Sequence, residues 1–354
     1  METHRPRVLL LAMYRLDTGE TGPTVRIAAV RAALSTRVSL DLVSGARLAR
    51  AWGMLRYALS GRLARLAGIY VESSSSLPGP ADLLFLALAR ALGVPVVTYV
   101  RDAYQLFPEY YPLTSLRRRV SRAAFLPVVR TMARLSSVVA FPSRGLARAV
   151  LGEHDRARTA ALLPPGARLP AVPAFDPAAR EILYVGSLAH GASGGSLLLD
   201  AMDLARRRVH DLRLICVVPE GQGLGAPHPP WLETVHGGDA EIIAVLPRVL
   251  ATVTPRLRTP YNDLAVPVKV LEYLGYGRPL IVTDASETAA IVEEAGCGVV
   301  APATPVGLAD GIATVAEAPA AQLRRWGDAA RRAAAANSWD ARADRILALL
   351  GLRP

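Results

Sequence analysis

The stretch that decides the fold, residues 256–284, reads RLRTPYNDLAVPVKVLEYLGYGRPLIVTD. Its pattern predicts a loop, a helix, a tight turn and a strand. Pro267 suits the first turn of a helix, and the spacing of Leu271 and Leu274 gives that helix an apolar stripe. Gly275 and Gly277 then end the helix before a run of strand-forming residues.

Lys269 lies near the start of this predicted helix and is the single lysine among 41 basic residues. It precedes Glu272 by three positions, so both side chains share one helical face. A compact ammonium group can occupy a place where a planar guanidinium group does not fit. Every other basic residue of the chain is arginine, so the lysine at this position indicates a site residue.

The rest of the chain alternates between apolar strand-like runs and helical spacing. Before residue 150 the predicted strands cover residues 8–12, 38–43, 69–72, 94–100 and 138–141; later ones cover 181–187, 212–218, 252–254, 280–283 and 298–300. A proline-rich linker at residues 162–176 separates the two series. This pattern predicts α/β architecture, with two doubly wound parallel sheets and a cleft between the domains.

The predicted domain boundaries follow from this linker. The first domain covers residues 1–165 and the second covers residues 176–354. A last helix is predicted to begin at Trp339, with Ser338 as its N-cap. The sequence leaves open that this C-terminal helix packs back on the first domain.

Composition limits the protein class. With 354 residues, of which 51% are hydrophobic, the chain can fill two full cores. Two cysteines are too few for a disulfide framework, so we expect both to be buried in a reducing cytoplasm. No apolar run is long enough for a transmembrane helix, and the apolar run at residues 8–12 is too short for a signal peptide.

Charge is distributed unevenly. Residues 1–175 hold 24 Arg against 10 acidic residues, a balance of +14, whereas the remainder balances at −3. Two predicted amphipathic helices, residues 47–66 and 115–135, carry much of this positive charge. They are suited to an anionic membrane surface, or they form the solvated outer face of ordinary core helices. No nucleic-acid-binding module is evident, so we expect no nucleic-acid partner.

Several polar residues follow predicted strands, where open α/β sheets bind ligands. Arg101, Asp102 and Glu109 are candidates for acceptor binding or proton transfer, with helix capping as the alternative for Asp102. Gly22 lies in a glycine-containing loop before the first helix, where backbone amides could meet a phosphate. The histidines are dispersed, His228 and His236 are expected in loops, and we expect no metal site.

Taken together, the motifs resemble those of the GT-B glycosyltransferases, in particular family 4. The resemblance is carried by Val185-Gly-Ser-Leu188, by the Pro-x-Lys-x-x-Glu pattern of residues 267–272 with Val282-Thr-Asp284, and by the closing Ser338-Trp339 helix. It is good over residues 181–350 and looser over residues 1–160. It implies two Rossmann-like domains, with a nucleotide-diphosphate sugar, UDP or GDP as nucleotide, on the second and the acceptor on the first.

The resemblance also implies roles for individual residues. Glu272 would hold the ribose hydroxyls, Lys269 the diphosphate or ribose, and Gly22 would approach the donor phosphates. Asp102 would lie near the acceptor and, with Lys269, is the candidate catalytic residue. The remaining candidate donor-binding residues are Gly186, Ser187 and Arg258. No Asp-x-Asp motif occurs, which fits metal-independent enzymes of this type.

Three positions depart from the family pattern. Leu264 replaces an expected glutamate, Ser187 stands at the position of an arginine, and a glycine-rich loop replaces a lysine. Lys269, with Arg256 or Arg258, would therefore have to stabilise the departing diphosphate.

We accordingly expect a cytoplasmic glycosyltransferase, peripheral at the inner membrane face. It would act on a lipid-linked, polysaccharide or other glycan acceptor, with retention of configuration by resemblance alone. Two alternatives stay open. One is a sugar-nucleotide 2-epimerase of the same fold, and the other is a catalytically silent scaffold or regulatory subunit at the membrane.

Overall fold

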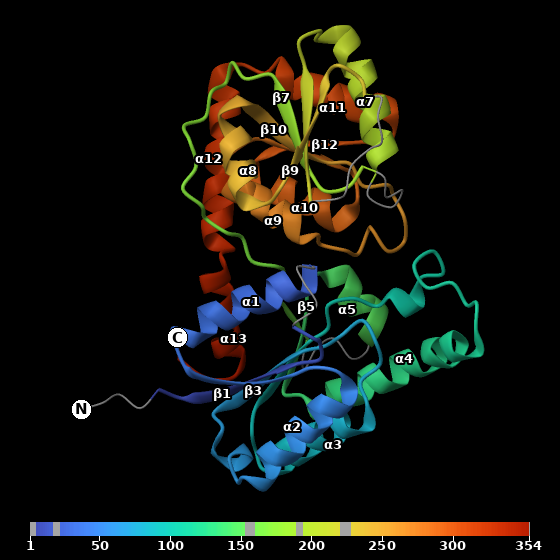
Figure 1. Ribbon diagram of the computed structural model, residues 1–354, viewed down its shortest axis with the longest axis vertical. Coiled ribbons are helices and arrows are strands. Elements are labelled where there is room, and N and C mark those ends of the chain that lie inside the picture. Colours follow the sequence, from blue (N-terminus) through green and yellow to red (C-terminus); the bar gives the residue numbers. More distant parts are fainter. Residues whose placement is uncertain (1–4, 17–21, 153–159, 189–193, 220–227, 354) are drawn as a thin grey trace. The chain divides into compact units, whose positions relative to one another are not determined.

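The computed structural model describes residues 5–16, 22–152, 160–188, 194–219 and 228–353. The chain divides into two compact units. Unit 1 comprises residues 1–166 together with 339–354, and unit 2 comprises residues 167–338. The last helix, α13 (Trp339–Leu349), therefore belongs to unit 1 although it follows unit 2 in the chain (Figure 1).

The described strands of unit 1 form a parallel sheet in the order β2-β1-β3-β4-β5-β6. These strands are β1 (Arg7–Ala12), β2 (Ser39–Ser44), β3 (Gly68–Glu72), β4 (Val96–Tyr99), β5 (Val138–Phe141) and β6 (Ala160–Leu162). Besides α13, the longer helices are α1 (Gly22–Ser35), α2 (Arg47–Leu59), α3 (Pro80–Ala91), α4 (Leu116–Leu135) and α5 (Arg144–Leu151). Short 3-10 turns lie at η1 (Leu63–Arg65) and η2 (Tyr104–Leu106).

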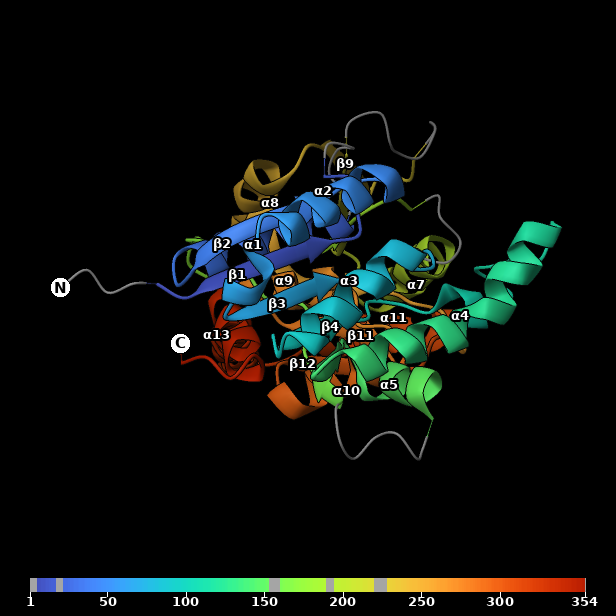
Figure 2. The ribbon, with the colours of Figure 1, turned by 90° about the horizontal axis from the view of Figure 1, so that it is seen from below.

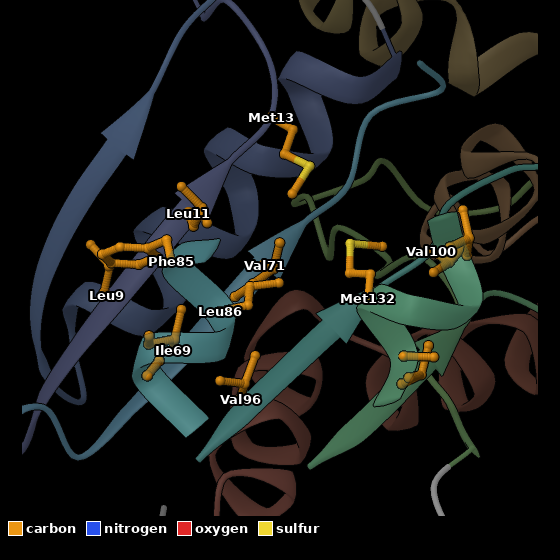
Figure 3. Packing of buried hydrophobic residues seen from close by; sticks show 14 of the residues in the cluster. Leu9, Leu11, Met13, Ile69, Val71, Phe85, Leu86, Val96, Val100 and Met132 are labelled. Carbon is orange, nitrogen blue, oxygen red and sulfur yellow. The ribbon is translucent and has the colours of Figure 1, made fainter. Parts of the chain in front are cut away.

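Alternating side chains of these strands supply the two faces of the sheet. Leu9, Ile69 and Val96 are in register and pack on one face against α2, α3, α4 and α5. Figure 3 shows this core, in which Phe85 and Leu86 of α3 meet the strand residues. The opposite face is covered by α1 and α13, which contact each other.

Unit 2 is a second parallel sheet, with its described strands in the order β12-β11-β10-β7-β8-β9. The strands are β7 (Glu181–Val185), β8 (Arg213–Val218), β9 (Leu232–His236), β10 (Val249–Thr254), β11 (Leu280–Thr283) and β12 (Gly298–Ala301). The helices are α7 (Gly195–Arg208), α8 (Asp239–Val245), α9 (Val268–Gly275), α10 (Ser286–Ala295), α11 (Pro305–Ala316) and α12 (Ala320–Ala336), with a 3-10 turn at η4 (Leu246–Arg248).

Two cores fill the space on either side of this second sheet. On one side α7 and α11 pack over residues such as Ile182 and Leu214. On the other side α8, α9 and α10 cover Leu183 and Ile215. The prediction of two doubly wound parallel sheets is therefore confirmed.

Some local predictions were incomplete or wrong. The edge strands β6 and β9 were not predicted, because Ala160–Leu162 is short and β9 is largely polar. His236, expected in a loop, is instead the last residue of β9. By contrast, α13 begins at Trp339 as predicted, and both cysteines are buried.

Trp339 should stabilise unit 1 and not unit 2, because its buried ring packs against Gly166 and lies 5.7 Å from the Arg26 guanidinium. We expect Trp339→Ala to lower the free energy of unfolding of unit 1 by about 3–5 kcal/mol. Hydrogen exchange should show the loss of protection in β1 and β3 first. The matched control, Trp326→Ala in unit 2, should loosen the strands of unit 2; equal loss in both units from Trp339→Ala would contradict the assignment.

Candidate functional site

The order of the unit 2 strands locates a candidate site. Counted along the chain from β7, the order is 3-2-1-4-5-6, and it reverses between β7 and β10. In open α/β sheets, ligands bind outside the carboxyl ends of the strands at such a switch point. Gly186 directly follows β7 there, and Pro255 and Arg256 directly follow β10.

The amino terminus of α7 lies against the same place. A Cβ atom on Gly194 would lie 1.4 Å from the carbonyl oxygen of Pro255, and one on Gly195 would lie 1.9 Å from the carbonyl oxygen of Leu188. Only glycine permits this approach, and Gly194 also has a left-handed φ of 76°. The positive end of a 14-residue helix therefore borders the switch point.

Lys269 projects from α9 toward the same turn. Its Nζ donates to the carbonyl oxygen of Val185 at 3.1 Å and lies 4.6 Å from the ring centroid of Tyr184. A Cβ atom on Gly186 would lie 3.3 Å from this nitrogen, and the φ of Gly186 is 129°. The turn after β7 and the first turn of α9 thus enclose a narrow space that holds one compact cation.

Electrostatics around this cation are unusual. Burial, and then the positive charge of Arg256, lower the pKa of Lys269 to about 8. Arg256 keeps its Nε buried without a hydrogen-bond partner, while its NH2 contacts Asn262. In the described part of the chain no carboxylate lies within ion-pair distance of either cation, and Glu272 acts on Lys269 only at longer range, so their charge is available to an anion.

Glu272, on the next turn of α9, faces a different group of residues. Its carboxylate lies 3.7 Å from Arg168, which also pairs with Asp239 at the start of α8. Burial raises the pKa of Glu272, and Arg168 opposes this rise. A hollow beside these groups is lined by Arg168, Pro170, Asp239, Ile243, Glu272 and Tyr276. This hollow measures about 60 Å³ and offers both ion-pair and apolar surfaces.

A second polar cluster lies at the corresponding edge of unit 1. The strand order there reverses between β1 and β3, and the cluster consists of residues that follow β1, β3 and β4. Arg101 donates through Nε and NH2 to Oδ2 of Asp102 at 2.8 and 2.6 Å, and the Ser75 hydroxyl donates to the same oxygen at 2.9 Å. The Arg101 guanidinium also lies 5.2 Å from the ring centroid of Tyr14.

Four buried atoms of this cluster have no hydrogen-bond partner among the described residues. They are the hydroxyl oxygen of Tyr14, NH1 of Arg101, Oδ1 of Asp102 and Oε1 of Gln105. A buried polar group without a partner is costly, so a native structure usually supplies it with water or a ligand. Burial also raises the pKa of Tyr14, which keeps its phenol protonated. The cluster therefore offers both hydrogen-bond donors and acceptors, and the charges of Arg101 and Asp102 offset each other.

The described residues contain no group of three or more His, Cys, Asp or Glu side chains arranged to hold a metal ion. None of their helices has the length and apolar character needed to span a bilayer.

Residues 179–318 match the family model described as glycosyl transferases group 1. These residues form a group 1 glycosyltransferase domain. The prediction of a glycosyltransferase is confirmed by this domain, while family 4 membership stays a prediction. No curated protein matches the sequence.

Solved structures similar to this glycosyltransferase cover both units. Sucrose-phosphate synthase from Thermosynechococcus elongatus is 14% identical with a TM-score of 0.66, covering 98% of each chain. Anabaena HepE in complex with UDP is 14% identical with a TM-score of 0.65, covering 98% of this chain and 99% of its own. A UDP-forming trehalose-phosphate synthase from Burkholderia xenovorans, in complex with glucose-6-phosphate, is 12% identical with a TM-score of 0.59, covering 98% of this chain and 100% of its own. These likenesses show the GT-B fold.

The structure places the predicted donor residues of the glycosyltransferase unevenly. Gly186 and Lys269 adjoin each other, and Ser187 accepts from the Tyr184 hydroxyl through its carbonyl oxygen at 3.4 Å. Arg258 is paired with Asp263 at 2.7 Å and Asp284 at 3.4 Å, so two carboxylates offset its charge. Gly22 is the exposed first residue of α1, and the loop at residues 17–21 lies outside the described residues.

On the acceptor side, Arg101 and Asp102 are in direct contact, whereas Glu109 lies in an exposed turn after η2. Asp102 binds Arg101 and Ser75 through its side chain, so its contacts are those of a polar cluster and not of a helix cap. Sequence reasoning missed Tyr14, Ser75, Gln105 and Arg168. The run Ser73–Ser76, directly after a buried strand, was the signal that could have indicated this cluster.

We expect Lys269 to lower the free energy of unfolding, because burial removes water from its charged ammonium group. Lys269→Met should raise the free energy of unfolding at pH 7 by about 1–2 kcal/mol. The pKa of Lys269 is lower in the folded chain, so the unfolded chain binds more protons between about pH 8 and 10.5, and wild-type stability should rise with pH across that window. Urea unfolding at several pH values should show this rise in the wild type and its loss in Lys269→Met.

The matched control for that measurement is Arg258→Met, which removes an exposed cation from the same region. Its effect should stay below about 1 kcal/mol. A destabilised Lys269→Met variant would show that Lys269 serves the fold of unit 2 instead of a ligand.

Proposed function

We propose that the protein transfers a sugar from a nucleoside-diphosphate sugar, with UDP or GDP as nucleotide, to a hydroxyl of a glycan or lipid-linked acceptor. One observation carries the proposal: two cations without carboxylate partners in the described chain, Lys269 and Arg256, lie with the amino terminus of α7 at the switch point of unit 2. Support comes from the group 1 glycosyltransferase domain and from HepE, whose structure contains UDP.

The chemistry requires this charge. When the bond between the sugar C1 atom and the diphosphate oxygen breaks, negative charge grows on the diphosphate. Fixed cations and a helix amino terminus stabilise that charge without having to reorganise. Binding of a diphosphate should also raise the lowered pKa of Lys269, because an anion favours the charged ammonium. We propose on this basis that no metal ion is needed; retention of configuration rests on the family resemblance alone.

Glu272 would hold the ribose at the edge of the hollow that it shares with Arg168 and Tyr276. A carboxylate can accept hydrogen bonds from both hydroxyls of a ribose, one on each oxygen. Arg168 at 3.7 Å keeps this carboxylate in place and compensates for its burial. Lys269 and Glu272 would thus contact different parts of the nucleotide from successive turns of one short helix.

In unit 1, the cluster around Asp102 would bind the acceptor hydroxyl. A hydroxyl both donates and accepts, and it therefore matches the free NH1 of Arg101 together with the free Oδ1 of Asp102. A phosphate only accepts and would face the carboxylate oxygen. We therefore propose an acceptor that presents an uncharged sugar hydroxyl here. As the new glycosidic bond forms, the hydroxyl proton would pass to Asp102.

Nucleotide binding tests the donor half of the proposal. Calorimetry with UDP and GDP should show that Glu272→Gln and Lys269→Ala each weaken the tighter nucleotide by about 10- to 100-fold, the loss expected for charged hydrogen bonds. Glu317→Gln, which changes an exposed carboxylate of unit 2, should bind normally. Unchanged affinity in the two site variants would favour the catalytically silent subunit.

Product analysis separates transfer from epimerisation. Incubation with the nucleotide sugar alone should give no sustained formation of its epimer. Continued epimer formation without any acceptor would contradict the transferase and support the 2-epimerase.

Acceptor-side variants form a separate test. Asp102→Asn should lower kcat by about 100-fold or more, the usual contribution of a positioned acid or base, while leaving nucleotide affinity unchanged. Asp340→Asn, at an exposed ion pair of the same unit, provides the control. The proposed role of Asp102 fails if Asp102→Asn keeps its kcat in steady-state assays with a glycan acceptor.

A further inference from the structure

Exposed apolar side chains gather on one group of helices in unit 1. Nine of the 13 large hydrophobic residues that are exposed in the described part of the chain lie on α2, α3 and α4, counting the C-cap residue of α3. The most exposed are Leu48 (87%), Leu59 (79%), Leu116 (77%) and Leu84 (71%). Exposed apolar residues that are scattered singly need no explanation, but a concentration such as this one marks an interaction surface.

The exposed residues of α2 form a regular stripe. Leu48, Trp52, Leu55 and Leu59 follow one another at intervals of four, three and four residues, which places them on one helical face. Met54 and Tyr57, which pack on the core, lie on the opposite face. The stripe therefore points away from the sheet. On α3, Leu84 and Leu88 are likewise exposed at a spacing of four.

These helices are neighbours. α3 contacts α2 on one side and α4 on the other, and Figure 2 shows the three side by side on one face of unit 1. Leu116 and Val120 expose apolar surface near the start of α4. The apolar side chains of separate helices thus belong to one side of the sheet.

Charge on the same helices is almost entirely positive. Together α2, α3 and α4 contain ten arginines and one acidic residue, Asp82. Asp82 is buried and paired with Arg50 at 2.7 Å, so no carboxylate of these helices faces solvent. The first turn of α4 alone carries Arg117, Arg118 and Arg119.

We propose that α2, α3 and α4 form a docking surface for a bilayer that contains anionic lipids. Leucine and tryptophan side chains enter the interface between headgroups and acyl chains, and the surrounding arginines bind the lipid phosphates. A second copy of this surface is a poor partner, because arginines would face arginines. Nucleic acid would engage the arginines but would leave the stripe of Leu48, Trp52 and Leu59 in water.

This inference rests on the proposed function only where it treats the protein as an enzyme with a bilayer as its partner, since attachment to the bilayer needs no nucleotide. It also gives the acceptor a location: an enzyme held on a bilayer by unit 1 would meet acceptors that are anchored in that bilayer. Attachment and catalysis are therefore tested with separate measurements.

Sedimentation with vesicles provides the test. The full chain should bind vesicles of phosphatidylcholine mixed with phosphatidylglycerol, bind vesicles of phosphatidylcholine alone far less, and detach as salt is added. Trp52→Glu should lower binding by about tenfold or more, because it removes an inserted aromatic ring and adds a repelled charge. Arg118→Glu should weaken binding about fivefold or more at low salt.

The matched control is Val306→Glu, which places the same charge at an apolar residue of unit 2 that is 63% exposed. It should bind vesicles like the wild type. UDP and GDP affinities of Trp52→Glu should also be unchanged, so failure of attachment is distinguishable from failure of the donor site.

Three outcomes would overturn the proposal. The first is equal binding to neutral and anionic vesicles, or binding to neither. The second is a dimer in solution that Trp52→Glu dissociates, which would assign the surface to a second copy. The third is binding to RNA or DNA that Trp52→Glu leaves intact while vesicles are not bound.

Discussion

Unit 1 depends on a buried ion pair. Arg26 of α1 donates through Nε to Glu72 of β3 at 3.1 Å, and its guanidinium group lies 3.7 Å from the ring centroid of Tyr99 on β4. Both charged side chains are almost completely buried, so removal of one partner would leave an uncompensated charge at a cost of about 3–5 kcal/mol. Because Trp339 lies on the same guanidinium group, one side chain sets the positions of α1 and α13 over the sheet.

The two candidate sites are built from the same topology and opposite electrostatics. Each lies where its strand order reverses, so parallel strands deliver residues from distant parts of the chain to one edge. In unit 2 the edge carries Lys269 and Arg256, whose mutual repulsion would be relieved by the diphosphate that we propose to bind there. In unit 1 the Arg101–Asp102 pair is already neutral, and what it lacks is hydrogen-bond partners. The first edge suits an anion, and the second suits a polar molecule without charge.

Sequence reasoning succeeded where a signal is local. Long apolar runs predicted most strands. The single lysine and its spacing to Glu272 also give a local signal, and the donor-binding role that it indicates stays a prediction. It failed where tertiary structure creates the signal. The polar edge strand β9 is held by one neighbouring strand, and Tyr14, Ser75 and Gln105 meet only because the sheet brings them together. Arg168 lies beyond the expected reach of the second domain, inside the predicted linker, and nothing in its neighbours in sequence indicates Glu272 as its partner.

The return of α13 to unit 1 has a consequence for biosynthesis. Unit 2 is one continuous segment, residues 167–338, and can fold as soon as that segment has left the ribosome. Unit 1 begins before unit 2 and is completed after it, since Trp339 covers the backbone of Gly166 only after α13 has been synthesised. Until then the charged guanidinium group of Arg26 lacks its final cover. The nascent chain therefore carries an open, basic first unit throughout the synthesis of the second, and this is the interval in which a chaperone would have most to protect.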